Sequence, residues 1–474
     1  MEFARRCRRV AALGAMVVAV AALPVETGAA PPASGASASG PTVLADEQIR
    51  ALLAERMAHN GVGIVVAVVE PGRRSVIAHG RSGAADGRPL DGDTVFQIGS
   101  VTKAFTTLLL ADMVVRGEVG LDDPASRYLP AGVTMPERGR PITLRDLATH
   151  MSGLPSMPAN LPLNSDPDPY EAYSVEQLFH FLSTYEPPRE PGVQWEYSNL
   201  GVTLLGRLLA RRAGLDYEAL LRRRILEPLG MNDTSIRLRP DQQRRVAQGH
   251  DRYLRPVRTW EMLNMPASGS LRSTANDMLK FIAAYLDPGR TPLSAAIALQ
   301  LRERLPLGPG SQALGWAITR EGIVSHAGGK QGYRSAAAFD PTGSRGLVIL
   351  ANARTDDQPI ALALHLLAGR SLPAPPIAPR NVVASVDRAT LDRYAGRYRL
   401  ANGQILEIAR KEGHLLVHRP GQGVSEFFPT GPRDFFLDTG NDEMSVIDAE
   451  GAVTGIILYG DGRGGEGMPA TRLD

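Results

Sequence analysis

Hydrophobic residues follow two kinds of pattern in the first 370 residues. Residues 62–69 form a continuous, β-branched apolar run, Pro71-Gly72 predicts a turn, and residues 75–79 form the partner strand of a hairpin. Further along, apolar residues recur at helical spacing. The helices that this spacing predicts cover residues 101–116, 144–150, 175–185, 200–213, 217–226 and 275–286.

Strand patterns return after the helical region. The predicted strands cover residues 313–319, 323–326, 335–339 and 347–352, and a last helix covers 359–367. Strands at both ends of one region favour a single antiparallel sheet flanked by helices, with a helical insertion beside it. This fold class is α/β in the broad sense, more strictly α+β, and a cleft between sheet and insertion is the natural place for a site.

A change in the residue pattern indicates a second domain. Pro373, Pro375, Pro376 and Pro379 can continue neither a helix nor a central strand, so they predict a linker. Short strand patterns separated by Gly, Asn, Asp and Pro follow at residues 404–408, 415–418, 435–437, 445–448 and 454–459. These short strands predict a small all-β module, which we expect to be a barrel.

The N-terminus has the features of an export signal. Four arginines precede an apolar run at residues 10–23, and Gly28-Ala29-Ala30 supplies the small residues of a cleavage site. A membrane-spanning helix needs roughly 20 residues, so this run predicts a cleaved signal peptide rather than an anchor. Cleavage removes Cys7, the only cysteine. We therefore expect a bacterial protein of the periplasm or the medium, with no stable membrane anchor.

These patterns divide the chain into five parts. The predicted parts are a signal peptide (1–30), a flexible tether (31–41), a hydrolase domain (42–370), a Pro-rich linker (371–385) and an all-β domain (386–474).

The composition and charge of the chain limit the kinds of molecule that we expect it to bind. The 474 residues are 43% hydrophobic and 22% charged, and 52 basic against 50 acidic residues give a formal charge of +2. A balanced charge is not typical of a nucleic-acid binder. The nine histidines are scattered, without metal-ligand spacing. We expect a small-molecule or peptide substrate, no nucleic acid, no metal and no other cofactor, and we leave the oligomeric state open.

The first chemical motif is Ser100-Val101-Thr102-Lys103 at the start of a predicted helix. A serine and a lysine three residues apart lie on one helix face, and the helix start favours negative charge on a serine oxygen. A buried lysine is held as a neutral amine, which could take the serine proton. Only four lysines occur among the 52 basic residues. The plain alternative is a capping serine and a surface lysine.

Two further motifs follow. In Tyr197-Ser198-Asn199 the tyrosine could shuttle a proton and the asparagine amide could hold both lysine and substrate, although a capping asparagine is the simpler interpretation. His326-Ala327-Gly328-Gly329 ends an apolar strand, where the Gly329 N–H could serve as an oxyanion donor beside that of Ser100. A plain glycine turn with an exposed histidine is the alternative for this motif.

Together the three motifs resemble the S-x-x-K, Y-x-N and K-T-G signature of penicillin-recognising serine enzymes. Residues 44–368 are similar to the class C β-lactamase, D-Ala-D-Ala carboxypeptidase and esterase family, and the last module resembles a lipocalin-like domain. The resemblance implies a nucleophile at Ser100, bases at Lys103 and Tyr197, and no cofactor. It also implies substrate or oxyanion contacts at Asn199, His326, Gly328 and Gly329.

The third motif departs from this family. Histidine and alanine replace the lysine and threonine of K-T-G, which hold a substrate carboxylate in the family. This change favours peptides, amides of D-amino-acid or cell-wall type, or esters, processed through an acyl-enzyme. The alternatives are a class C-like β-lactamase and a non-catalytic penicillin-binding-like recognition protein. The sequence leaves open whether Lys103 or Tyr197 is the acylation base.

Overall fold

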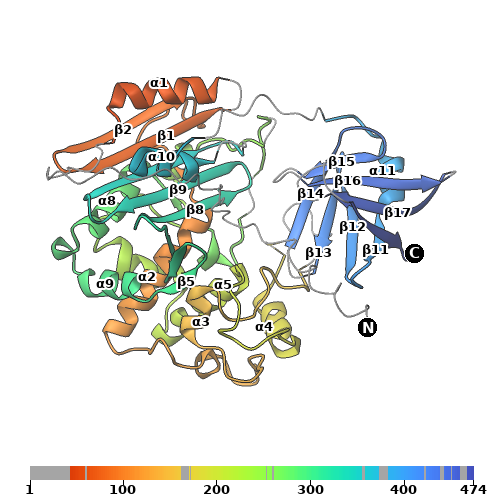
Figure 1. Ribbon diagram of the computed structural model, residues 1–474, viewed down its shortest axis with the longest axis horizontal. Coiled ribbons are helices and arrows are strands. Elements are labelled where there is room, and N and C mark those ends of the chain that lie inside the picture. Colours follow the sequence, from red (N-terminus) through yellow and green to blue (C-terminus); the bar gives the residue numbers. More distant parts are fainter. Residues whose placement is uncertain are drawn as a thin grey trace, which may run out of the picture. The chain divides into compact units, whose positions relative to one another are not determined.

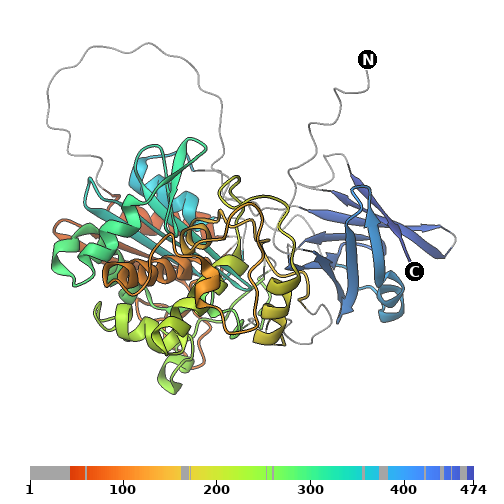
Figure 2. The ribbon, with the colours of Figure 1, turned by 90° about the horizontal axis from the view of Figure 1, so that it is seen from below.

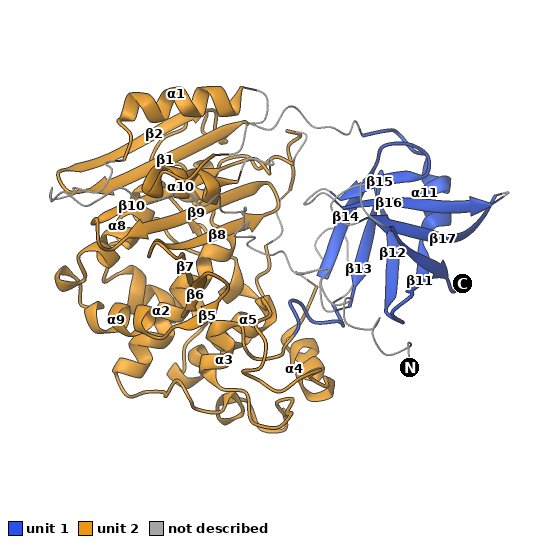
Figure 3. Cartoon of the chain, in the orientation of Figure 1, with its two compact units in different colours: residues 1–31, 155–164, 381–474 blue, residues 32–154, 165–380 orange. Residues whose placement is uncertain are grey.

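The computed structural model describes residues 43–58, 61–161, 170, 172–251, 254–258, 261–354, 358–372, 383–420, 423–437, 442–449, 451–459 and 467–474. The chain forms two compact units (Figure 3). The larger unit comprises residues 32–154 and 165–380, and the smaller one comprises residues 1–31, 155–164 and 381–474. The predicted signal peptide and tether, and most of the predicted linker, lie outside the described residues, and the five-part division stays a prediction.

An eight-stranded antiparallel sheet organises the larger unit (Figure 1), in the order β2-β1-β10-β9-β8-β7-β6-β5. The two ends of the region meet in its middle, where β1 pairs with β10 and Val66 lies opposite Ile349. The strands are β1 (Gly63–Glu70), β2 (Arg73–Gly80), β5 (Leu305–Leu307), β6 (Gly310–Ala313), β7 (Trp316–Ile318), β8 (Val324–Lys330), β9 (Tyr333–Asp340) and β10 (Arg345–Ala351). A separate short pair joins β3 (Phe96–Gln97) to β4 (Arg272–Ser273).

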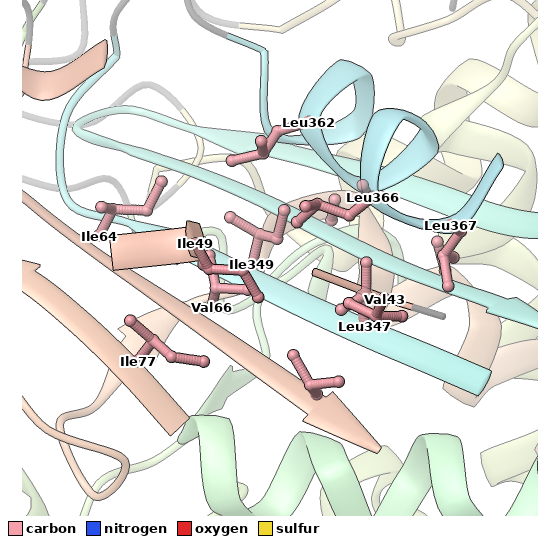
Figure 4. Close-up of a cluster of buried hydrophobic side chains, with 14 of the residues drawn as sticks. Val43, Ile49, Ile64, Val66, Ile77, Leu347, Ile349, Leu362, Leu366 and Leu367 are labelled. Carbon is pink, nitrogen blue, oxygen red and sulfur yellow. The ribbon is translucent and has the colours of Figure 1, made fainter. Parts of the chain in front are cut away.

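One face of the sheet is covered by the helices α1 (Asp46–Met57) and α10 (Pro359–Ala368). Their apolar side chains pack on those of β1, β2, β9 and β10, as Figure 4 shows for Ile49, Val66, Ile349 and Leu366. Apolar burial of this kind is the main stabilising contribution to a sheet face. The sequence pattern did not predict α1.

Aromatic side chains fill the other face of the sheet. Phe105 of α2 (Thr102–Val115) stacks on Phe281 of α8 (Ala275–Leu286), with ring centroids 3.9 Å apart. Trp316 of β7 packs edge to face on Phe339 of β9 at 5.4 Å. This packing fixes α2, which carries the serine-lysine motif, beneath the sheet.

The remaining helices of the larger unit form the predicted insertion (Figures 1 and 2). They are α3 (Leu144–Thr149), α4 (Val175–Thr184), α5 (Asn199–Ala213), α6 (Tyr217–Leu221), α7 (Pro240–Arg244) and α9 (Ser294–Arg302). The predicted helix 217–226 divides after Leu221, where a π-helical turn over Arg222–Leu226 takes over. The predicted strand 313–319 also divides, because Gly315 takes φ +70° and turns the chain between β6 and β7.

The smaller unit contains a closed eight-stranded antiparallel barrel, in which β11 pairs with β18. Its strands are β11 (Gly396–Leu400), β12 (Ile405–Lys411), β13 (His414–Arg419), β14 (Gly423–Pro429), β15 (Asp434–Leu437), β16 (Glu443–Ala449), β17 (Ala452–Tyr459) and β18 (Met468–Arg472). The short helix α11 (Arg388–Tyr394) precedes them, and buried Tyr398, Phe427 and Phe435 belong to their common core. An antiparallel sheet with a helical insertion, together with a C-terminal barrel, confirms the predicted fold class.

Candidate active site

Ser100 lies on a 3-10 turn, Gly99–Val101, between β3 and α2. Gly99 takes φ +50°, and a Cβ atom there would lie 2.7 Å from the Gly329 carbonyl oxygen, so this close approach of two backbone segments requires glycine. The Ser100 side chain is partly exposed, whereas α2 behind it is largely buried. The turn therefore presents the serine oxygen at the accessible start of a rigid helix.

Lys103 is fully buried and faces Ser100 from the first turn of α2. Its Nζ atom donates to Ser100 Oγ at 3.1 Å, to Asn199 Oδ1 at 2.8 Å and to the Ser268 carbonyl oxygen at 2.6 Å. Three acceptors from three elements fix the position of the amine. The alternative of a surface lysine is therefore wrong.

Tyr197 and Asn199 reach the same serine from the start of α5. The Tyr197 hydroxyl donates to Ser100 Oγ at 2.8 Å, and Lys103 Nζ lies 4.8 Å from the centroid of the tyrosine ring. Ser198 caps the helix, because its Oγ accepts the N–H of Gly201 at 2.8 Å. The capping-asparagine interpretation is therefore wrong, and the Asn199 amide oxygen is available to Lys103.

His150, to which the sequence analysis gave no role, holds the segment that carries Tyr197. Its carbonyl oxygen accepts the Glu196 N–H at 2.9 Å, and its Nδ1 accepts the Ser198 N–H at 3.2 Å. The imidazole packs on the Tyr197 ring with centroids 4.6 Å apart. His150 ends α3 in the left-handed conformation, at φ 62°, a conformation that costs a non-glycine residue on the order of 1 kcal/mol.

The strand β8 brings the third motif to the turn that carries Ser100. Pairing of β7 with β8 ends at Ser325, whereas pairing with β9 continues to Lys330. Antiparallel alternation directs the N–H groups of Ala327 and Gly329 away from β9, toward this unpaired edge. A Cβ atom at Gly328 would lie 2.1 Å from the Ile98 carbonyl oxygen, so glycine allows the strand and the turn to touch.

Burial controls the proton affinities of the site. Burial, helped by the charge of Lys330, lowers the pKa of Lys103 well below its usual value, although its three acceptors favour the ammonium form. Burial, with the charge of Lys103, lowers the pKa of His326 to about 4. Burial also raises the pKa of Tyr197, whose hydrogen bond to Ser100 opposes the shift. At neutral pH His326 is a neutral imidazole and Tyr197 is a phenol, while burial favours the neutral amine form of Lys103.

The structure brings together the residues that the sequence singled out. Ser100, Lys103, Tyr197 and Asn199 form one hydrogen-bonded group, and His326, Gly328 and Gly329 lie on the adjacent strand. Two groups that contribute to the site were not predicted from the sequence, the His150 side chain and the Ser268 carbonyl. His150 is the last residue of the predicted helix 144–150, where nothing marked it as part of a site, and the Ser268 carbonyl has no signature because every residue carries one.

The model of the Beta-lactamase family matches residues 49–370. The chain belongs to this family. One relative of this chain is "Penicillin-binding protein 4*" of Bacillus subtilis, which is 28% identical over 79% of this chain and 87% of that protein. A "D-alanyl-D-alanine-carboxypeptidase/endopeptidase" of Escherichia coli is 30% identical over 61% of this chain and 78% of that protein. The protein is a serine hydrolase, acting on small-molecule or peptide substrates as its family does.

Solved structures of the Beta-lactamase family share the fold. A class C β-lactamase from Rhodobacter sphaeroides superimposes with a TM-score of 0.60 and 27% identity, covering 68% of this chain and 98% of that one. A β-lactamase/D-alanine carboxypeptidase from Yersinia pestis superimposes with a TM-score of 0.56 and 25% identity, covering 64% of this chain and 93% of that one.

Within the described residues, no helix has the length and apolarity to cross a membrane. The same residues hold no cluster of three or more His, Cys, Asp or Glu side chains suited to a metal ion.

The low pKa of His326 predicts a loss of stability in acid. The unfolded chain takes up this proton near pH 6.5 and the folded protein only near pH 4, so the stabilisation is complete above pH 6.5 and is lost as the pH falls toward 4. Because the ring is partly exposed, we expect the difference to be about 1–2 kcal/mol. Urea unfolding at pH 7 and pH 4.5 should show that His326→Gln loses this much less free energy of unfolding than the wild type.

The exposed His180 provides the matched control, and His180→Gln should retain the pH dependence of the wild type. Equal acid losses in the wild type and in His326→Gln would contradict the assignment.

Proposed function

We propose that the protein hydrolyses peptides, amides or esters through an acyl-enzyme on Ser100. The observation that carries the proposal is the position of Ser100 Oγ, which lies 3.1 Å from Lys103 Nζ and 2.8 Å from the Tyr197 hydroxyl. A serine is a weak nucleophile unless a base takes its proton, and such a base must lie within hydrogen-bond reach. Two candidate bases meet that condition.

Electrostatics favour Lys103 as the base for acylation. Burial lowers the pKa of Lys103 and so favours the neutral amine, the form that can accept a proton, and the raised pKa of Tyr197 keeps the phenol protonated. Lys103 therefore takes the Ser100 proton while Oγ forms its bond to the substrate carbonyl carbon. Tyr197 donates its proton to the departing nitrogen or oxygen, and the proton on Lys103 replaces it, so the two residues pass one proton from nucleophile to leaving group.

The backbone supplies stabilisation for the oxyanion. The N–H of Ser100 and the N–H of Gly329 are the proposed donors, because Ser100 lies at the start of α2 and the Gly329 N–H points to the unpaired edge of β8. The closeness of the two segments supports this pairing, since a Cβ atom at Gly99 would lie 2.9 Å from Gly329 N. Water then attacks the acyl carbon and gives one proton to Lys103, and the Lys103–Tyr197 pair returns a proton to Ser100 Oγ as the acyl bond breaks.

The favoured substrates are D-amino-acid peptides and amides, or esters. The carboxypeptidase/endopeptidase named among the relatives supports this class. The His326 Nδ1 lies 2.7 Å from the Ala327 carbonyl oxygen, which can only accept, so Nδ1 carries the proton and the neutral ring presents an unprotonated Nε2. Such a ring offers a substrate carboxylate neither charge nor a proton, which ranks substrates that depend on a bound carboxylate, β-lactams among them, below neutral amides and esters. Asn199 and Gly328 complete the proposed contacts with the substrate.

We further propose that the enzyme is exported to the periplasm or medium through cleavage of residues 1–30, and that it binds no nucleic acid. The arginines, apolar run and small residues of the N-terminus support export.

A substrate panel tests the proposed function. Purified protein should hydrolyse p-nitrophenyl esters, D-amino-acid amides or D-Ala-D-Ala peptides faster than nitrocefin. An intact-mass shift during turnover should identify the acyl-enzyme. Turnover of nitrocefin alone would favour a β-lactamase, and binding without turnover of any compound would favour a recognition protein.

A further inference from the structure

His150 has a backbone conformation that is unfavourable for a histidine. It ends α3 in the left-handed region at φ 62°, whereas α5 and α10 end in the same conformation on Gly214 and Gly369. Glycine adopts this conformation without a steric cost, which is why it is the usual residue at such helix ends. A strained residue persists where the surrounding structure requires it, so we expect the His150 side chain to have a role.

The N–H of Ser198 shows why a side chain is needed at position 150. Ser198 is fully buried and caps α5, and a buried N–H needs an acceptor. In α3 and α4 the N–H of the capping residue donates to the side chain of the third helical residue, Asp146 or Gln177. The third residue of α5 is Gly201, which has no side chain. The acceptor is instead His150 Nδ1, at 3.2 Å.

His150 holds Tyr197 from both sides. Its carbonyl oxygen accepts the N–H of Glu196 at 2.9 Å, and its Nδ1 accepts the N–H of Ser198. The imidazole also packs on the Tyr197 ring, with centroids 4.6 Å apart. One residue thus fixes both the backbone and the ring of Tyr197, whose hydroxyl donates to Ser100 Oγ at 2.8 Å.

Burial keeps the acceptor on His150 available. The residue is 2% exposed, and burial, with contributions from Lys103 and His326, lowers the pKa of His150 well below its usual value. A neutral imidazole has one protonated and one unprotonated nitrogen, and because Nδ1 accepts, the proton lies on Nε2. An imidazolium would have no acceptor, so the hydrogen bond to Ser198 depends on the neutral ring.

We propose that His150 is a positioning residue, which holds the Tyr197 hydroxyl on Ser100 by accepting the Ser198 N–H at Nδ1. This inference rests on the proposed function, in which Tyr197 gives its proton to the departing atom and receives one from Lys103. A displaced hydroxyl delivers that proton slowly. His150 therefore matters more for poor leaving groups, which need a proton, than for good ones, which leave as anions.

Two esters with the same acyl group test this role. The butanoate of 4-nitrophenol releases a stable anion, whereas the butanoate of 4-nitrobenzyl alcohol needs a proton on its leaving oxygen. The ratio of kcat/KM for the 4-nitrobenzyl ester to that for the 4-nitrophenyl ester measures proton delivery during acylation. His150→Phe keeps a ring but removes the acceptor, and it should lower this ratio by roughly 10- to 100-fold. His150→Asn should restore most of the ratio, because asparagine tolerates the left-handed conformation and its Oδ1 can accept the Ser198 N–H.

A double-mutant cycle shows whether His150 acts through Tyr197. Tyr197→Phe alone should lower the ratio at least as far as His150→Phe does, and adding His150→Phe to it should change the ratio by less than about 2-fold. The matched control is His250, a buried histidine of the same unit whose Nδ1 lies 3.1 Å from the Asn352 carbonyl oxygen. His250→Phe should leave the ratio unchanged. Thermal unfolding verifies folding, and His150→Ala replaces His150→Phe if the latter does not fold.

An unchanged ratio in His150→Phe, an additive effect in the cycle, or no recovery in His150→Asn would overturn the inference. Failure of the proposed function would instead give no Ser100 adduct and no turnover of either ester by the wild type. Crystal structures of the wild type and His150→Phe then decide the question. A Tyr197 hydroxyl that moves out of hydrogen-bond distance of Ser100 Oγ only in the variant would support the inference, and an unmoved hydroxyl would overturn it.

Discussion

Replacing Ser100 with alanine is expected to lower kcat for ester and amide hydrolysis by about 10⁴- to 10⁶-fold, as loss of the nucleophile does in other serine hydrolases. The remaining rate would come from substrate binding and the oxyanion donors. In the wild type, a fluorophosphonate or penicillin adduct should map by mass spectrometry to the peptide that contains Ser100. The variant should give no adduct, because the hydroxyl that forms the bond is absent.

A second serine provides the control for this prediction. Ser126 is exposed on a 3-10 turn in the same unit, and Ser126→Ala should retain both labelling and turnover. Labelling that persists in Ser100→Ala would place the nucleophile elsewhere and remove the basis of the proposed mechanism.

The motif of Ser100 and Lys103 could be predicted because its geometry is local. A spacing of three residues at a helix start places both side chains on one face wherever the helix packs. The structure adds the 3-10 turn that raises Ser100 above the helix, and this turn depends on Gly99 and on its contact with Gly329. That contact joins residues 230 positions apart, which no local pattern can show.

The same limit explains what the sequence left undecided at Tyr197 and Asn199. Serine and asparagine are both good helix caps, so the tripeptide alone does not show which residue begins the helix. The structure assigns the cap to Ser198, and the site needs this assignment, because a capping Asn199 would use the amide oxygen that Lys103 contacts. His150 was missed for a related reason, since its two hydrogen bonds reach a segment more than 40 residues away.

Errors in the predicted elements have equally local causes. The predicted strand 313–319 has a suitable apolar pattern, but the positive φ of Gly315 makes it a hairpin. The helix α1 was not predicted because polar and apolar residues mix along it without a clear helical period. Its buried side is defined by packing against the sheet. In the barrel, the patterns predicted the strands that correspond to β12, β13, β15, β16 and β17. The strands β11, β14 and β18 gave no alternation clear enough to predict.

Lys103→Arg is the second large-effect prediction, and it distinguishes the two candidate bases. Arginine keeps the positive charge but has no neutral form in proteins, so it cannot take the Ser100 proton. A general base contributes roughly 10²- to 10⁴-fold to a rate, and we expect the acylation rate of Lys103→Arg to fall by that factor. Single-turnover acylation by a p-nitrophenyl ester, measured across pH, gives this rate separately from deacylation.

The Tyr197→Phe variant tests the other candidate base. The raised pKa of Tyr197 keeps its phenol protonated at neutral pH, so its loss should slow proton delivery to a poor leaving group more than attack on an activated ester. Lys280→Arg, on α8 beside Asp277, is the control for a lysine outside the site, and thermal unfolding verifies that each variant is folded. If Lys103→Arg acylates at nearly the wild-type rate while Tyr197→Phe does not, then Tyr197 takes the serine proton, and the role of Lys103 is to supply charge to the oxyanion or to orient the tyrosine.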